Sequence, residues 1–126
     1  MQKDLFEYAV IRVVPRVERE EFMNVGVVLY CAKQRFLQAM FQLDEDRLQA
    51  FSPDLDISEV NAYLCAFQHI CNGSISGGRI ARLPTAERFR WLTATRSTVV
   101  QTSRVHPGFC SDPAEALQRL YMQMVL

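Results

Sequence analysis

A chain of 126 residues, 49% hydrophobic and 22% charged, has the length and composition of one globular domain rather than of a disordered or membrane protein. Fourteen Lys or Arg balance fourteen Asp or Glu, so net charge gives no general attraction to nucleic acid or to an anionic membrane. The apolar runs are far shorter than the roughly 20 residues of a membrane-spanning helix, and the polar segment Met1–Glu7 does not resemble a signal peptide. We therefore expect a cytoplasmic protein.

The first part of the chain predicts three strands. Residues 8–14 are rich in aromatic and β-branched side chains and end at Pro15. Residues 24–31 form a second apolar run, in which Gly26 indicates a bulge or a close backbone approach. Only a short polar break separates this run from residues 36–41, so the second and third strands are expected to form a hairpin.

Helical signals follow these strands. Residues 44–51 predict a short helix that stops before Pro53, because the residue ahead of a proline avoids the helical conformation. Asp56 with Glu59 then matches a capping box at the start of a longer helix. Its core-facing side is predicted from apolar residues at helical spacing, namely Ile57, Val60, Leu64, Phe67 and Cys71.

The segment after this helix predicts two strands and one helix. Residues 79–83 are compatible with a short edge strand, and Pro84 begins a helix that is expected to continue to about Trp91. Helical spacing sends Phe89 inward, and we expect Trp91 to be a core anchor. Residues 97–103 predict a further strand.

The chain closes with a predicted turn and a helix. His106–Gly108 is expected to form a turn, because proline fixes its own φ and glycine supplies unusual backbone angles. The types of Asp112, Pro113 and Glu115 are those favoured at the N-cap, the first position and the third position of a helix, respectively. They predict a C-terminal helix that packs on the sheet or on a second subunit.

The order of these elements lacks the regular strand–helix alternation of a parallel fold. We expect the α+β class, with an antiparallel or mixed sheet of four to five strands and with helices packed on one face. Residues 1–126 are expected to form a single domain.

The four cysteines contain no CxxC pair, and we expect them to be reduced and mostly buried. Cys65 and His69 are four residues apart on one predicted helix and would supply half of a metal site. Because no second pair has a suitable spacing, we assign no metal ligands and no cofactor.

The charges are unevenly distributed. Residues 1–60 carry seven Lys or Arg against eleven Asp or Glu, whereas residues 79–104 carry six Arg against Glu87 alone. Twelve of the fourteen basic residues are arginine, which grips carboxylates and phosphates with two parallel hydrogen bonds. These arginines either solvate a surface and pair with the acidic first half, or they form a face that recognises an anion or a partner.

The predicted strand at residues 97–103 has polar side chains on both faces, which is typical of an edge strand or of a strand in a cleft. One interpretation is a Thr/Ser-rich edge strand without a ligand. The other is an anion-binding or partner-binding site, whose candidate residues are Arg96, Ser97, Gln101, Ser103 and His106.

Two further classes of function stay open as alternatives. An enzyme would need a nucleophile, a base and an orienting group, and no such spacing is present, so we name no catalytic residue. A nucleic-acid-binding module would need a basic groove with stacking aromatics. The closest match is Arg88-Phe89-Arg90-Trp91.

Several blocks of the sequence are specific when taken together: residues 8–15, 21–29, 88–94, 96–103 and 106–108. They resemble the family of small bacterial proteins catalogued as domain of unknown function 3037, and the resemblance covers nearly the whole chain. It implies no established activity and no catalytic residues. It also implies a partner, since relatives are often encoded beside a HipA-like protein with a kinase fold. Thr95 departs from the proline expected in relatives, so the turn that leads into Arg96 is expected to differ from theirs.

From these observations we expect a cytoplasmic, non-enzymatic protein-interaction or regulatory domain that binds another bacterial protein through the region Arg96–His106 and the strand around Gly26. A homo-oligomer is compatible with this interpretation. The alternatives are an enzyme or nucleotide- or anion-binding domain that uses the same Arg96–His106 region, and a nucleic-acid-binding module.

Overall fold

The computed structural model describes residues 2–126. The strands are β1 (Asp4–Val13), β2 (Met23–Cys31), β3 (Phe36–Phe41), β4 (Val100–Thr102) and β5 (His106–Cys110). The α-helices are α1 (Glu45–Phe51), α2 (Ile57–Asn72), α3 (Thr85–Leu92) and α4 (Pro113–Met124). Three single-turn 3-10 helices are η1 (Val17–Arg19), η2 (Ile75–Gly77) and η3 (Ile80–Arg82).

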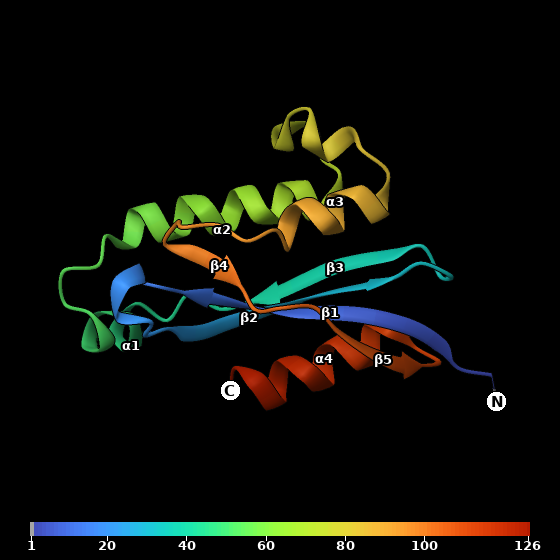
Figure 1. Cartoon of the computed structure of the whole chain (residues 1–126), viewed down its shortest axis with the longest axis horizontal. Helices are drawn as coiled ribbons and strands as arrows, with labels where there is room; N and C mark the ends of the chain where they lie inside the picture. The colour runs from blue at the N-terminus through green and yellow to red at the C-terminus, as the bar shows by residue number, and fades with distance from the viewer. Residues whose placement is uncertain (1) are drawn as a thin grey trace.

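The five strands form one antiparallel sheet in the order β3-β2-β1, and both β4 and β5 pair with the other side of β1. β5 pairs with the first half of β1, and β4 pairs with its end (Figure 1). The α+β class is confirmed, with an antiparallel sheet of five strands. β1 begins at Asp4, earlier than the apolar pattern predicted, because β5 lies beside residues 4–8.

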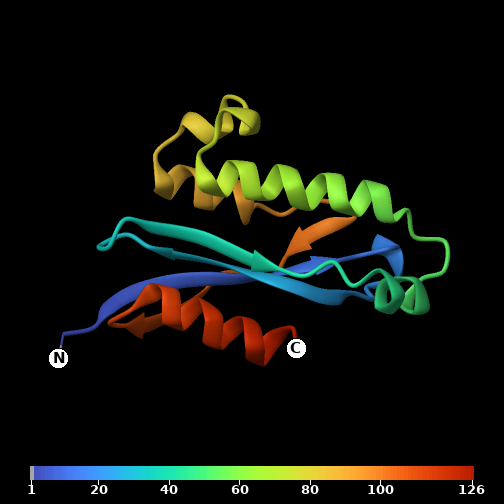
Figure 2. The same cartoon turned by 180° about the vertical axis from the view of Figure 1, so that it is seen from behind.

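Helices cover both faces of this sheet, which corrects the expectation that all helices pack on one face. α2 and α3 lie on one side and α4 lies on the other (Figures 1 and 2). In β2 the alternating residues Val28 and Tyr30 belong to the core under α2 and α3, whereas Val27 and Leu29 belong to the core under α4. A strand that is apolar at every position needs cover on both faces. The continuous run of residues 24–31 was the signal for this arrangement.

Aspartates begin three of the four α-helices. The carboxylate of Asp44 accepts from the N–H of Arg47 at 3.1 Å, and that of Asp56 accepts from the N–H of Glu59 at 3.2 Å. Asp112 accepts from the N–H of Ala114 at 3.1 Å. Each carboxylate satisfies a backbone donor that the first turn leaves unpaired. The predicted helix starts are therefore confirmed.

The bulge predicted around Gly26 is present. The pairing of β1 with β2 shifts between Ile11, opposite Gly26, and Arg12, opposite Asn24. Val25 is the extra residue, and it is buried in the core under α2 and α3. A β-bulge changes the direction of the neighbouring side chains. Here it places Arg12 and Asn24 beside each other on the α4 face of the sheet.

Two predictions of local structure are wrong. Residues 79–83 form no strand but the 3-10 turn η3, in which Ala81 is buried and the N–H groups of Arg82 and Leu83 donate to carbonyls three residues back. His106–Gly108 forms no turn but the start of β5. A glycine is needed there because a Cβ on Gly108 would lie 2.4 Å from the Phe6 ring, and Pro107 is tolerated because it lies in an edge strand.

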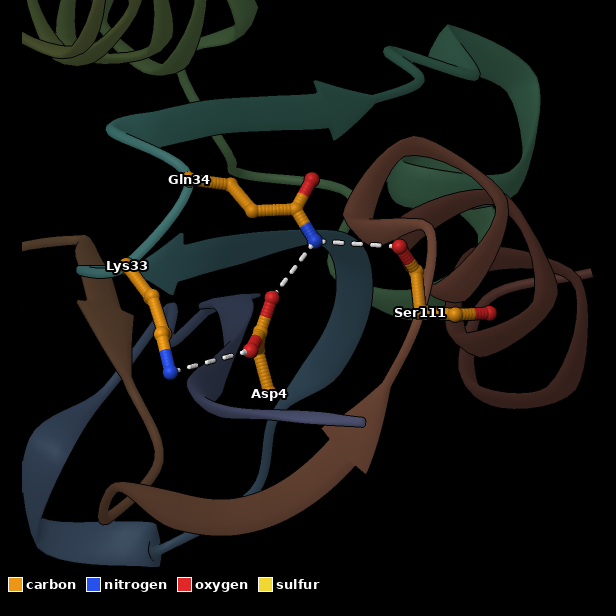
Figure 3. A network of polar contacts seen from close by, with 4 residues as sticks. All are labelled: Asp4, Lys33, Gln34 and Ser111. Atoms are coloured by element: carbon orange, nitrogen blue, oxygen red, sulfur yellow. Dashed lines mark hydrogen bonds and ion pairs between the residues drawn. The ribbon is translucent and has the colours of Figure 1, made fainter. Parts of the chain in front are cut away.

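A polar network ties the β2–β3 turn to the start of β1 (Figure 3). The amide nitrogen of Gln34 donates to the carboxylate of Asp4 at 2.9 Å and to the carbonyl of Ser111 at 3.0 Å. Lys33 lies 4.0 Å from the same carboxylate. Three segments that are distant in the sequence meet here, so this end of the sheet is held by side chains as well as by the ladder. None of the helices within residues 2–126 is long and apolar enough to cross a membrane.

Candidate functional site

The five residues predicted to form a site lie in sequence along one edge of the sheet but do not converge. Arg96 and Ser97 lie in the loop after α3, Gln101 lies in β4, Ser103 lies between the two edge strands, and His106 begins β5. Arg96 and Gln101 line two different hollows of the surface. The five side chains therefore do not build one pocket.

Arg96 caps the end of α3. Its guanidinium donates to the carbonyls of Trp91 and Leu92 and lies 4.8 Å from the centre of the Trp91 ring. A positive charge at the C-terminus of a helix interacts favourably with the unpaired carbonyls there. Burial lowers the pKa of Arg96 from its ordinary value. Part of the donor capacity of Arg96 is thus already used within the chain, and its remaining surface lies against an aromatic ring.

The hollow beside Arg96 is an apolar groove of about 280 Å³ between α2, α3 and β4. We call it the α2–α3 groove, and it is lined by Tyr63, Ala66, Phe67, Ile70, Trp91, Leu92, Arg96, Thr98 and Val100. Tyr63 and Trp91 are 40% and 45% exposed, which is high for aromatic side chains beside a core. The prediction that Trp91 is a core anchor is wrong, because Phe89 and Leu92 occupy the buried face of the short helix α3.

Sequence reasoning missed Tyr63 as part of a surface. The signal was present in α2, where Tyr63, Ala66 and Ile70 recur at helical spacing beside the buried stripe that includes Phe67. When the apolar stripe of a helix is wider than the face that the core covers, the extra apolar residues indicate a second apolar contact.

Gln101 and Thr98 shape the loop before β4. The amide nitrogen of Gln101 donates to the Thr98 carbonyl at 2.9 Å, and the Thr98 hydroxyl donates to the Val100 carbonyl at 2.7 Å. Side chains that bond to nearby backbone compete with the regular ladder. This is why the strand predicted at residues 97–103 is reduced to Val100–Thr102.

Ser103 has a structural position. It is the one buried polar residue within residues 2–126, and its hydroxyl oxygen accepts from the Val10 N–H at 2.9 Å. Its own N–H donates to the Val10 carbonyl at 2.8 Å, and its hydroxyl donates to the Arg104 carbonyl at 2.9 Å. Ser103 thus pairs with the backbone N–H and carbonyl of Val10 in β1, in the gap between β4 and β5.

We predict that Ser103→Ala lowers the free energy of unfolding by about 2 kcal/mol, because the buried Val10 N–H loses its acceptor. The measurement is urea denaturation followed by circular dichroism. Ser97→Ala is the matched control, since Ser97 is exposed, and its effect is expected to stay within about 0.5 kcal/mol. Equal effects of the two substitutions would contradict the structural role of Ser103.

His106 packs against another aromatic residue of the sheet. It lies opposite Tyr8 in the β1–β5 register, and the two ring centres are 5.4 Å apart. Its ring is partly buried in this contact. His106 is therefore separated from Arg96 by the whole length of β4 and the break at Ser103.

Comparison with known proteins identifies a family. A model of the family described as "Protein of unknown function (DUF3037)" matches residues 8–125. The chain belongs to this family. The resemblance found in the sequence is thereby confirmed over nearly the whole chain. No curated protein and no solved structure matches the chain significantly.

The arginines of residues 79–104 in this DUF3037 family member have no carboxylate partners. The ion pairs formed within residues 2–126 are Arg19–Glu21, Lys33–Asp4 and Arg119–Glu115. Arg88 instead donates to the carbonyls of Ile70 and Cys71, both at 3.2 Å, and so caps the end of α2. These arginines therefore do not pair with the acidic first half of the chain, which was one of the two interpretations of the sequence. Four of them are exposed, namely Arg79, Arg82, Arg90 and Arg104.

Cys71 and the pair His69–Ser74 of this DUF3037 chain lie in structural positions. Burial raises the pKa of the Cys71 thiol to about 12, with Arg88 opposing this shift, so Cys71 stays protonated at neutral pH. Nδ1 of His69 lies 3.1 Å from the Ser74 hydroxyl, at the end of α2. That hydroxyl lies 3.4 Å from the backbone carbonyl of His69. Within residues 2–126 no group of three His, Cys, Asp or Glu side chains is arranged to hold a metal ion.

Proposed function

We propose that the chain is a non-enzymatic interaction domain that binds a partner protein in the α2–α3 groove, through an apolar anchor flanked by acidic residues. The observation that carries this proposal is the pair of half-exposed aromatic rings, Tyr63 and Trp91, which line one apolar groove. Tyr and Trp are enriched among residues that dominate binding at protein interfaces. A groove of this volume accommodates a few partner side chains rather than a large cofactor.

Charge around the groove selects the partner. Residues 57–104 carry six Arg against Glu59 and Glu87, so the layer formed by α2, α3 and the following loop is positive. Arg90 is exposed on α3 next to Trp91, and Arg96 lies over the Trp91 ring. Complementary charge favours association and excludes basic partners. An acidic segment with an aromatic or aliphatic anchor therefore fits this surface best.

A HipA-like protein with a kinase fold is the first partner to test, because the family resemblance suggests it. A cytoplasmic location belongs to the same proposal. Its support is that all four cysteines are free, with Cys31, Cys71 and Cys110 buried, as in proteins of reducing compartments. Of the site residues predicted from the sequence, Arg96 remains part of the proposed interface.

The test compares tagged wild type with Tyr63→Arg and Trp91→Ala in co-purification from the native host, with quantitative mass spectrometry. We expect at least one protein to be lost by both variants. Substitution of an interface hot spot costs about 2 kcal/mol or more, which corresponds to roughly a thirty-fold weaker complex. The purified partner is then titrated against each variant, and its affinity for wild type is expected to fall with added salt.

Phe109→Ser is the matched control, because Phe109 is 66% exposed and lies on β5, away from the groove. It is expected to retain the partner. Circular dichroism of all three variants checks that the fold is intact. Retention of every co-purifying protein by both groove variants would show the proposal to be wrong, and so would a specific loss with Phe109→Ser alone.

The nucleic-acid alternative is less favoured by the geometry. Of the two aromatic residues that suggested it, Phe89 is buried and stacks on Tyr30 with ring centres 5.3 Å apart. Only Trp91 is exposed, and Arg96 lies over its ring. Single-stranded binding relies on aromatic rings that are open to successive bases. A mobility-shift assay with single-stranded DNA is expected to show no binding at physiological salt.

A further inference from the structure

Arg12 is a guanidinium without a partner on the α4 face of the sheet. Its neighbours Ile11 and Val13 point into the core under α2 and α3, so Arg12 points to the opposite face. Its Nε–H is buried and donates to no acceptor within residues 2–126, and all ion pairs of that part of the chain lie elsewhere. Buried polar groups are almost always paired, so each exception requires an explanation.

A second unpaired atom lies on the neighbouring strand. Asn24 is opposite Arg12 in register, and its amide nitrogen donates to the Met124 carbonyl at 3.2 Å, at the end of α4. Its Oδ1 is buried and accepts from no donor in the described residues. The bulge at Val25 brings this donor and this acceptor to one face, and neither satisfies the other.

The surface around Arg12 is hollowed. The hollow has a volume of about 330 Å³, and we call it the Arg12 hollow. It is lined by Arg12, Val14, Val17, Glu20, Phe22 and Gln101. The Arg12 guanidinium lies 3.9 Å from the centre of the Phe22 ring, which holds its plane in place. Val17 and Phe22 are both nearly half exposed, so apolar surface extends from the guanidinium to solvent.

We propose that the Arg12 hollow is a binding site for a carboxylate attached to an apolar group. The guanidinium receives the carboxylate through its two terminal Nη–H groups, and the apolar group packs on Val17 and Phe22. The hollow lies on the opposite face of the sheet from the α2–α3 groove, so this site is separate from the proposed partner interface.

The charge count favours a monoanion over a phosphate. Arg12 is the only cation that lines the hollow within residues 2–126, and Glu20 contributes a carboxylate to the same lining. A dianion would find no second cation to neutralise its charge, and Glu20 would repel it. Burial lowers the pKa of Arg12, and no carboxylate among residues 2–126 offsets this desolvation. A bound anion would offset it.

The experiment follows the 1H–15N correlation of the Arg12 Nε–H during titration of the wild-type protein with hexanoate, and with hexanamide as the neutral isostere. Because this Nε–H is buried, its exchange with solvent is expected to be slow enough for detection. We expect a saturable shift with hexanoate, with a dissociation constant on the order of 1 mM, and less than about a tenth of that shift with hexanamide. This measurement uses the wild-type protein alone.

Two variants locate the site. Arg12→Gln is expected to abolish the hexanoate-induced shifts at the backbone amides of Phe22 and Gln101. Arg104→Gln removes an exposed arginine elsewhere and is expected to leave them unchanged. A peptide ending in leucine, tested with a free and with an amidated C-terminus, distinguishes a peptide terminus from a free acid as the source of the carboxylate.

The proposal is overturned if about 10 mM hexanoate leaves the Arg12 Nε–H resonance in place, or if hexanamide shifts it equally. The same conclusion follows if inorganic phosphate binds more tightly than hexanoate. In the first case Arg12 is a structural residue that rests on Phe22, and in the other two the hollow binds a ligand of a different chemical class. None of these outcomes bears on the α2–α3 groove.

Discussion

Gly26→Ala is expected to lower the free energy of unfolding by about 3 kcal/mol, near the upper end for overpacking a core. A Cβ at this position would lie 2.5 Å from the Met40 carbonyl oxygen and 2.6 Å from the Phe41 Cβ. The first atom is part of the backbone of the paired strand β3, and the second is bonded directly to that backbone. No side-chain rotation therefore relieves the overlap. Urea denaturation of wild type and variant, followed by circular dichroism, measures the difference.

Gly108→Ala is the informative comparison for this prediction. Its added Cβ would meet the far end of the Phe6 ring at 2.4 Å, and a side chain can be shortened. We expect Gly108→Ala to cost about 2 kcal/mol on its own and to be partly compensated by Phe6→Leu in a double-mutant cycle. Gly26→Ala is expected to show no such compensation with Phe41→Ala. A Gly26→Ala variant within about 1 kcal/mol of wild type would contradict the close approach of β2 and β3.

Elements defined by local chemistry were predictable from the sequence. The aspartates at positions 44, 56 and 112 act through hydrogen bonds two or three residues away, and they mark the starts of α1, α2 and α4 correctly. The strands at residues 24–31 and 36–41 were found for a similar reason, since their long apolar runs are separated by a short break. Such signals do not depend on the rest of the fold.

Predictions that depended on distant neighbours failed. Nothing near residues 106–108 in the sequence shows that Phe6 requires a glycine opposite it, so an extended edge strand was interpreted as a turn. Trp91 was expected to be a core anchor, but the buried face of the short helix α3 consists of Phe89 and Leu92. In both cases the packing of another element decided the outcome.

The predicted site shows the same limit. Ser103 looked like a ligand-binding hydroxyl because it is a polar residue in a polar strand, yet it satisfies the backbone of β1 across the sheet. Arg96 caps α3, and Arg88 caps α2. Arg12 was passed over because it interrupts an otherwise apolar strand. Its missing partner is visible only when the strands on both sides and the bulge are in place.

The second prediction concerns the two cores. Leu64 in α2 and Leu117 in α4 are buried on opposite faces of the sheet. We expect Leu64→Ala and Leu117→Ala each to lower the free energy of unfolding by about 3 kcal/mol, because each leaves a cavity in a packed core. Met122→Ala is the control in α4, since Met122 is 58% exposed, and its effect is expected to stay below about 0.5 kcal/mol.

The same variants test our proposal that residues 1–126 unfold as one unit. Trp91 is the only tryptophan and lies on the α2–α3 side, so its fluorescence reports the layer farthest from Leu117. β1 and β2 contribute alternate residues to both cores, so loss of either core removes the support of the shared strands. We therefore expect Leu117→Ala to shift the fluorescence transition as much as the circular dichroism transition.

An unshifted fluorescence transition with a two-step circular dichroism curve would contradict this proposal. It would mean that α4 and its core detach from the sheet while the α2–α3 side stays folded. The α2–α3 groove would then keep its shape without α4, whereas β2 would lose the hydrogen bond between Asn24 and the end of α4. Coincident transitions would instead mean that both surfaces depend on the same global folding equilibrium, because alternate residues of β1 and β2 belong to the cores on both faces of the sheet.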